Sequence, residues 1–143
     1  MNYLLVATNS AVFLALAALH VRWVFQLKMD SSPVVPTLEG KPVFQPGRMA
    51  KGVVALGLFG FAYVTLSAVT GWLPARWVFY GNLAIGGIFL LRAVGDFRYV
   101  GFFKKVKNTA FARNDTRYYS PLCLLLGVIA LGVAWRLKEL SEP

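Results

Sequence analysis

The residues best suited to chemistry lie in one stretch of the chain, from Leu90 to Pro121. Arg92 and Asp96 are four residues apart in it, which on a helix places them within reach of an ion pair. Further cations, tyrosines and hydroxyl side chains follow. Arginine can donate two parallel hydrogen bonds to a phosphate or a carboxylate, and hydroxyl groups can add more. The stretch therefore predicts a site for an anion.

Two residues of the first apolar segment are expected to complete this site. His20 and Trp23 are three residues apart, so on a helix they share a face with Asn9. Polar groups that face lipid are costly, and this face should therefore point into the protein. The candidate site then consists of His20, Trp23, Arg92, Asp96, Arg98, Lys104, Asp115, Arg117, Tyr118 and Ser120.

Each of these residues also has a structural explanation, which the sequence leaves open. Arg92 can pair with Asp96 or extend toward the membrane surface as an anchor. His20 can hydrogen-bond Asn82, Asp96 or a carbonyl across the helices. Tyrosines fit an interfacial aromatic belt, lysines can contact anionic lipid, and a carboxylate or hydroxyl can cap a helix. The tyrosines are Tyr118 and Tyr119, the lysines are Lys104, Lys105 and Lys107, and the cap candidates are Asp115 and Ser120.

The chain has one cysteine and one histidine, and this limits its chemistry. A single Cys123 excludes an intrachain disulfide and a Cys-x-x-Cys redox pair. A single His20 excludes haem held by two histidines of one chain and leaves no dense His/Cys cluster for zinc. We therefore expect no cofactor and no metal.

The overall composition indicates a membrane protein. Of the 143 residues, 57% are hydrophobic and 15% are charged, and the mean hydropathy is +0.59. These values lie on the apolar side of soluble domains. The net charge is +9, and because the charges lie between long apolar runs, anionic lipid headgroups are a simpler partner than nucleic acid.

The apolar runs predict one all-α integral membrane domain over residues 1–143. Four transmembrane helices, at about 3–27, 49–71, 76–97 and 119–137, should form an antiparallel bundle. Glycine stripes in the second and fourth helices are typical of close helix packing and leave a homo-oligomer open.

The two long connections should lie on the same side of the membrane. In the first, over 28–48, four prolines prevent a long helix, so this loop either folds over the polar end of the bundle or is mobile. In the second, we expect a short interfacial helix between the third and fourth spans, with Asp115, Thr116 or Ser120 as the cap of the fourth. Both connections are rich in Lys and Arg, which predicts cytoplasmic loops and termini outside.

The stretch LRAVGDFRYVGFFKKVKNTAFARNDTRYYSPLCLLLG, from Leu91 to Gly127, resembles a family of small four-span bacterial membrane proteins of unknown function, DUF3995. Its RA-x-GDFRYVGFFK and DTRYYSPLC runs are the most distinctive, and His20-x-x-Trp23 is similar to a further family signature. The resemblance implies four spans in the bacterial inner membrane. It implies no reaction.

Three functions are compatible with these patterns. The first is binding, moving or presenting an anionic amphiphile or lipid headgroup in a polar pocket at the cytoplasmic leaflet. The second is an enzyme acting on a lipid-linked substrate, with His20 or Asp96 as the general base. The third is a small exporter or assembly partner that acts as a homo-oligomer.

Overall fold

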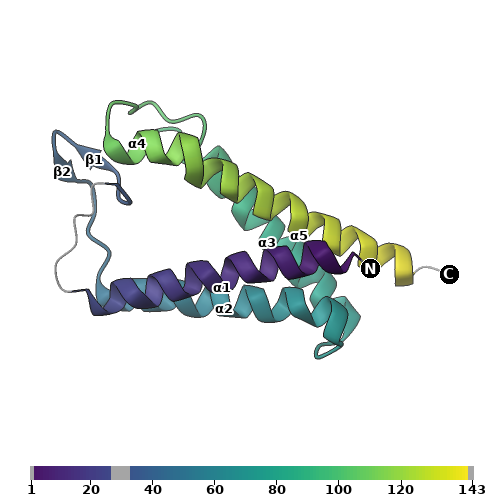
Figure 1. Cartoon of the computed structure of the whole chain (residues 1–143). Coiled ribbons are helices and arrows are strands. Elements are labelled where there is room, and N and C mark those ends of the chain that lie inside the picture. The colour runs from purple at the N-terminus through teal and green to yellow at the C-terminus, as the bar shows by residue number, and fades with distance from the viewer. Residues whose placement is uncertain (1, 27–32, 142–143) are drawn as a thin grey trace.

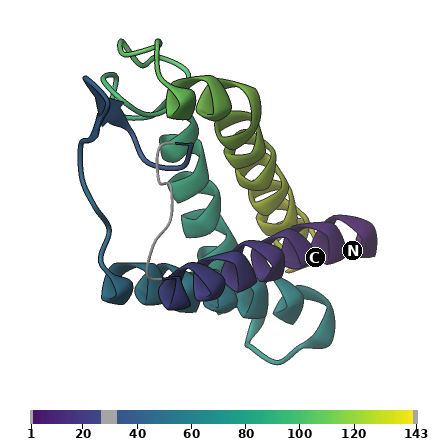
Figure 2. The same ribbon diagram turned by 60° about the vertical axis from the view of Figure 1, so that its left-hand side comes forward.

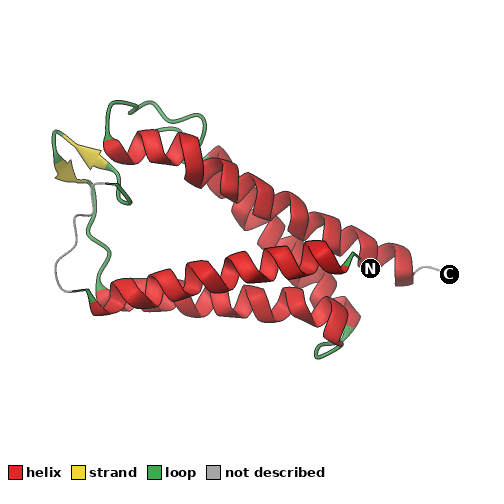
Figure 3. Ribbon diagram, in the orientation of Figure 1, coloured by secondary structure: helices red, strands yellow, loops and turns green. Residues whose placement is uncertain are grey.

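The structure is a computed structural model, and it describes residues 2–26 and 33–141. Within these residues, four helices are long and apolar enough to cross a membrane, which confirms the prediction of an all-helical multi-pass protein. Two short strands form an antiparallel hairpin between the first two helices (Figure 3). The elements are α1 (Tyr3–Phe25), β1 (Thr37–Leu38), β2 (Lys41–Pro42), α2 (Arg48–Thr70), α3 (Ala75–Val94), α4 (Ala110–Asn114), the π-helical turn η1 (Asp115–Tyr119) and α5 (Ser120–Ser141).

The helices pack in two pairs, α1 along α2 and α3 along α5. The two pairs are close together at the end where α1 begins and α5 ends, and they diverge toward the loops (Figure 1; Figure 2). The hairpin β1–β2 lies at the wide end of this wedge (Figure 1). The loops and the helix ends around them therefore lie where the two pairs are farthest apart (Figure 1).

Aromatic residues join the two pairs in the core. Phe13 of α1 is fully buried, and its ring centroid lies 5.8 Å from that of Phe61 in α2 and 5.4 Å from that of Phe89 in α3. Within the second pair, small residues allow a close approach, since a Cβ atom added to Gly86 would lie 3.2 Å from the carbonyl oxygen of Gly127. Packing is therefore tight within α3–α5, and between the pairs Phe89 contacts both Phe13 and Phe61 within a largely aliphatic core.

Polar side chains are also buried in the helical core. Thr65 donates a hydrogen bond to Asn82 Oδ1 at 3.2 Å, and Asn82 Nδ2 donates to the carbonyl oxygen of Val78 at 2.9 Å. Asn9 is completely buried, which confirms that this side of α1 faces inward. His20 is not bonded to Asn82 or Asp96; its Nδ1 donates to the carbonyl oxygen of Leu16 in its own helix at 2.8 Å.

The last membrane helix begins earlier than the sequence analysis predicts. Thr109 is its N-cap and accepts a hydrogen bond from the backbone N–H of Ala112 at 3.0 Å, and the helix continues without a break through η1 into α5. Asp115, Thr116 and Ser120 therefore do not cap the helix, and a loop over 95–109 stands where an interfacial helix was expected.

Proline explains why this helix contains a π turn. Pro121 has no N–H to donate to the carbonyl oxygen of Arg117, four residues earlier, and its ring crowds that carbonyl in an α-helix. The wider turn η1 ends immediately before, with the N–H of Ser120 donating to the carbonyl oxygen of Asp115, five residues back. The helix widens at this point instead of ending.

Candidate functional site

A buried ionic cluster is centred on Asp115, the first residue of η1. The side chain of Asp115 has no exposed surface. Its Oδ1 accepts from Arg92 Nη2 at 2.9 Å, and its Oδ2 accepts from the Gly101 N–H at 2.8 Å and from Lys104 Nζ at 3.0 Å. One carboxylate oxygen is thus bonded to a donor from α3, and the other to two donors from the loop over 95–109.

Lys104 is the second buried ion of this cluster. Only 1% of its side chain is exposed. Besides Asp115, its Nζ donates to the Gly101 carbonyl oxygen at 2.8 Å and to Thr116 Oγ1 at 2.6 Å. The expectation that Lys104 contacts anionic lipid is therefore wrong, because its ammonium group is enclosed by protein, whereas Lys105 and Lys107 are exposed.

The loop that supplies Lys104 is held in shape by two glycines and a carboxylate. Gly95 and Gly101 adopt φ of +85° and +88°, and a Cβ atom added to either would clash with the backbone of the opposite side. Asp96 Oδ1 accepts from the N–H groups of Arg98, Tyr99 and Val100 at 2.8 to 3.0 Å. Slight burial raises the pKa of Asp96, but the backbone donors outweigh it and hold that pKa below the ordinary value of 3.8.

The expected ion pair between Arg92 and Asp96 is not formed. α3 ends at Val94, with Gly95 as its C-cap, so Asp96 is not on the helix and the geometry of residues four apart on a helix does not apply. Asp96 bonds the loop backbone, and Arg92 reaches Asp115 instead. Arg92 is therefore connected to the last helix, across 23 residues of sequence.

A cavity of about 460 Å³ lies beside this cluster, between the ends of α1 and α2, the segment before α2, and Arg92. We call it the cationic pocket. Its polar side chains are His20, Lys51 and Arg92, and the rest of its lining is largely apolar: Trp23, Val34, Val35, Pro36, Phe44, Pro46, Ala50, Val54, Val100 and Phe111. Among residues 2–26 and 33–141, no carboxylate lines it.

The hydrogen bonds of the pocket residues leave some of their donors unpaired. Arg92 Nη1 is buried and has no hydrogen-bond partner within the described chain. Lys51 Nζ donates to the Trp23 carbonyl oxygen over 3.4 Å, a long bond. Because a carbonyl only accepts, His20 Nδ1 carries the proton in its bond to Leu16, and Nε2 has no hydrogen-bond partner among residues 2–26 and 33–141.

The first loop forms one wall of the pocket, through Val34, Val35, Pro36, Phe44 and Pro46. The carbonyl oxygen of Pro33 accepts hydrogen bonds from Asn114 Nδ2 at 3.3 Å and from the Tyr119 hydroxyl at 3.0 Å, and Val35 is 4% exposed. Of the two alternatives for this loop, residues 33–47 therefore show the folded one, in contact with α4 and η1. The other residues of the predicted loop, 28–32, lie outside the described residues.

The structure brings together only part of the predicted site. His20, Trp23 and Arg92 line the cationic pocket, and Asp115 and Lys104 lie behind Arg92 as its ionic support. The other predicted members are outside the pocket lining. Asp96, Arg98, Arg117 and Tyr118 are exposed, the two arginines lying over Tyr99 and Tyr118 at 5.1 and 5.4 Å, and Ser120 is buried with no partner for its hydroxyl.

Sequence reasoning missed the contribution of the segment 33–54. Lys51 was not among the predicted site residues, and no periodic pattern identified Val35, Pro36 or Phe44 as pocket residues. One available signal was the length of the proline-rich loop, because a connection of this length commonly carries function. The enzyme hypothesis with His20 and Asp96 gains no geometric support, since the Asp96 carboxylate is bonded to its own loop.

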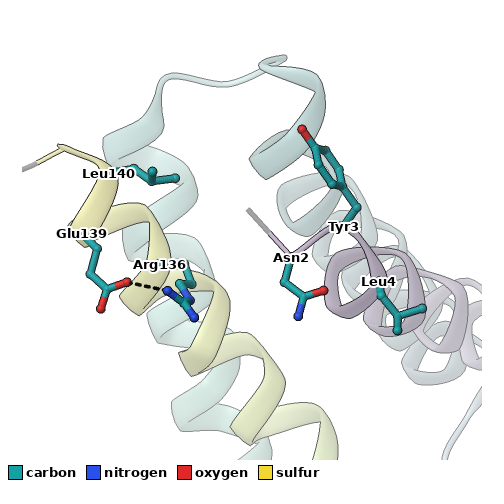
Figure 4. A pocket seen from close by; sticks show the side chains of 6 residues that line it. All are labelled: Asn2, Tyr3, Leu4, Arg136, Glu139 and Leu140. Atoms are coloured by element: carbon teal, nitrogen blue, oxygen red, sulfur yellow. Dashed lines mark hydrogen bonds and ion pairs between the residues drawn. The ribbon is translucent and has the colours of Figure 1, made fainter.

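A larger hollow, of about 570 Å³, lies at the opposite end of the molecule (Figure 4). It is lined by residues at the start of α1 and the end of α5. Its arginine, Arg136, bonds Glu139 Oε2 at 3.1 Å, and both side chains are about half exposed or more. The charges there cancel, so the smaller cationic pocket is the better candidate for a ligand.

Fold and site together define a small integral membrane protein of four spans, with a cationic pocket at the end where the loops lie. The family described as "Protein of unknown function (DUF3995)" matches the chain over residues 13–130, and the chain belongs to this family. The comparisons with curated proteins and with solved structures give no match.

Proposed function

We propose that this protein binds an anionic amphiphile, with the phosphate or carboxylate head in the cationic pocket. The observation that carries the proposal is the state of Arg92. One terminal nitrogen of its guanidinium bonds Asp115, and the other, Nη1, is buried without a partner. A buried N–H without an acceptor is costly, so an anionic oxygen at this position would be stabilised.

The charges of the cluster support the same ligand. Arg92 and Lys104 carry two positive charges, and Asp115 supplies one negative charge. This leaves an excess of one positive charge beside the pocket, to which Lys51 adds a further cation from α2. In a partly enclosed site, such an excess attracts an anion more strongly than it would in water.

The apolar part of the lining favours an amphiphile over a simple inorganic anion. Trp23, Phe44 and Phe111 line the same cavity as the three polar side chains. Ligand sites of this kind combine apolar surface with a few polar groups that fix orientation. A lipid headgroup with the first part of its hydrocarbon chain matches this combination.

The membrane placement that goes with this function has the pocket at the cytoplasmic leaflet of the bacterial inner membrane. The loops at the pocket end carry most of the basic residues, as cytoplasmic loops do, and both termini would then be outside. Exposed cations of these loops, such as Lys105 and Lys107, would contact anionic headgroups. The four spans would form an antiparallel bundle that presents, or moves, the bound lipid from this leaflet.

Binding of butyl phosphate to the protein in nanodiscs of zwitterionic lipid tests the proposal, because this probe has the head but only a short tail. Arg92→Leu should weaken binding by roughly tenfold to a hundredfold, the value of one hydrogen bond to a charged group. Lys51→Met, a milder change at the pocket wall, should also weaken it. Lys105→Gln is the matched control, since it removes an exposed cation outside the pocket. Equal affinity of wild type, Arg92→Leu and Lys51→Met, with helical circular dichroism unchanged, would reject the proposal.

A further inference from the structure

An apolar groove of about 370 Å³ lies between α2 and α3, nearer to the turn that joins them than the cationic pocket is. Its lining is entirely apolar and includes Gly57 and Gly60 of α2 and Gly81 and Ile85 of α3. Figure 1 and Figure 2 show that α2 and α3 diverge from this turn toward the loops. The groove is thus near this turn, and the cationic pocket is nearer to the loops.

Two glycines of α2 leave this groove empty. A Cβ atom added to Gly57 or Gly60 would meet nothing within 4 Å, whereas one added to Gly81 would meet Val64 Cγ1 at 2.6 Å. Glycines that serve helix packing have a neighbour at close distance. Gly57 and Gly60 have none among the described residues, so neither glycine packs against a neighbouring helix there.

Part of the lining of the groove and of the cationic pocket lies along one face of each helix, whereas Lys51 and Gly60, nine residues and half a turn apart, flank that face of α2 on opposite sides. On α2, Ala50 and Val54 line the pocket and Gly57, Phe61 and Val64 line the groove, at spacings of four, three, four and three residues. This is the spacing of one continuous helix face.

On α3, Gly81 and Ile85 line the groove, and Arg92 lines the pocket seven residues beyond Ile85. Spacings of four and seven again keep to one face of a helix. From Lys51 in the pocket to Val64 in the groove there are 13 residues, about 20 Å along the helix axis. A single leaflet has a hydrocarbon depth of about 15 Å, half of the usual core.

We propose that this groove holds the acyl chain of the amphiphile whose anionic head occupies the cationic pocket. The inference rests on the proposed function and makes its ligand more specific: a long-chain anionic lipid, bound with one tail along α2 and α3. The charge of the adjoining pocket and the continuity of the two lined faces favour this occupant over a helix from a second copy. A helix would fill the groove without using the cations.

The test uses a long-chain alkyl phosphate that carries a photoreactive diazirine at the middle of its tail. It is compared, in nanodiscs of zwitterionic lipid, with the alkyl alcohol that has the same tail and no charge. The phosphate probe should label peptides covering 54–64 and 81–88 roughly tenfold more than the alcohol, the ratio of one charge-assisted hydrogen bond.

Two glycine variants make the test specific for the groove. Gly60→Leu should reduce labelling by the phosphate probe to the level of the alcohol, because the new side chain occupies open space in the groove. Gly87→Leu is the matched control: it also has nothing within 4 Å of an added Cβ atom, but it does not line the groove. It should label like wild type.

Failure of this inference can be told from failure of the proposed function. If both probes label the groove equally, or if Gly60→Leu labels like wild type, the tail site is rejected. The tail site is also rejected if crosslinking shows a second copy of the chain in the groove and the probe no longer labels it. Arg92-dependent binding of butyl phosphate would in these cases leave the head site standing, whereas its absence would reject both.

Discussion

Replacing Asp115 by asparagine tests whether the buried cluster is held by charge. Asp115 is the only carboxylate bonded to Arg92 and Lys104 among the described residues. Asp115→Asn raises the excess positive charge of the cluster from one to two, with one of the two cations almost fully buried. Removing one partner of a buried ion pair typically costs about 3–5 kcal/mol. We therefore expect a loss of this size in the free energy of unfolding.

Replacing Lys104 or Arg92, the other two members of the cluster, should lower the unfolding free energy by less. Lys104→Met leaves Asp115 bonded to Arg92 and to the Gly101 N–H, and the charges of the remaining pair cancel. Arg92→Leu should cost least, because a third of its side chain is exposed and solvent already weakens its interaction. Combining Asp115→Asn with Lys104→Met should recover part of the loss, since the unpaired buried cation is then gone.

Unfolding by sodium dodecyl sulfate in mixed micelles, followed by tryptophan fluorescence and circular dichroism, would measure these values. All variants keep the four tryptophans of the chain, so the signal is comparable. Two results would refute the reasoning. One is Asp115→Asn within about 1 kcal/mol of wild type, the level of a surface ion pair. The other is a double variant that is no more stable than Asp115→Asn alone.

Two further predictions concern the loop over 95–109. Gly95→Ala should lower the unfolding free energy by about 1–3 kcal/mol, because its φ of +85° and the nearby Val100 backbone both oppose a side chain. Gly40→Ala is the control in the same micelle assay: Gly40 has a φ of +77° but open space around it, so this change should cost less. The opposite order of the two losses would contradict this account. Asp96 should stabilise the loop fully above pH 3.8, its ordinary pKa, and the effect should be lost only as the pH falls through its lower folded pKa. Hydrogen exchange at the amides of 98–100 would detect the loss, and a step that persists in Asp96→Asn would show that another group causes it.

The helices were predictable because hydropathy and length are local properties. Runs of apolar residues identified the membrane helices, and those of α1, α2 and α3 lie close to the expected ranges. The start of the last helix was not predictable in this way. Asp115, Thr116 and Ser120 have the chemistry of a cap, but the fixed structure of the loop before them places the cap at Thr109.

The site was predictable in its residue types but not in its pairings. Arg92, with its need for a carboxylate, was identified from its position near the end of an apolar run. Its partner could not be found from spacing, since Asp115 is 23 residues away and reaches Arg92 only after the loop has folded. Lys51 and the apolar lining from 33–46 were missed for the same reason: their contribution depends on how a proline-rich segment lies over the helices.

The π turn between Asp115 and Tyr119 makes this region sensitive to the length of the chain. Successive residues of a helix are rotated by about 100° around its axis. Deleting one residue from the turn would remove the wide geometry and rotate Asp115 away from Arg92. The contacts of α5 with α3 would stay as they are. Insertions and deletions in related chains should therefore avoid this turn, even though sites of equal exposure elsewhere would accept them.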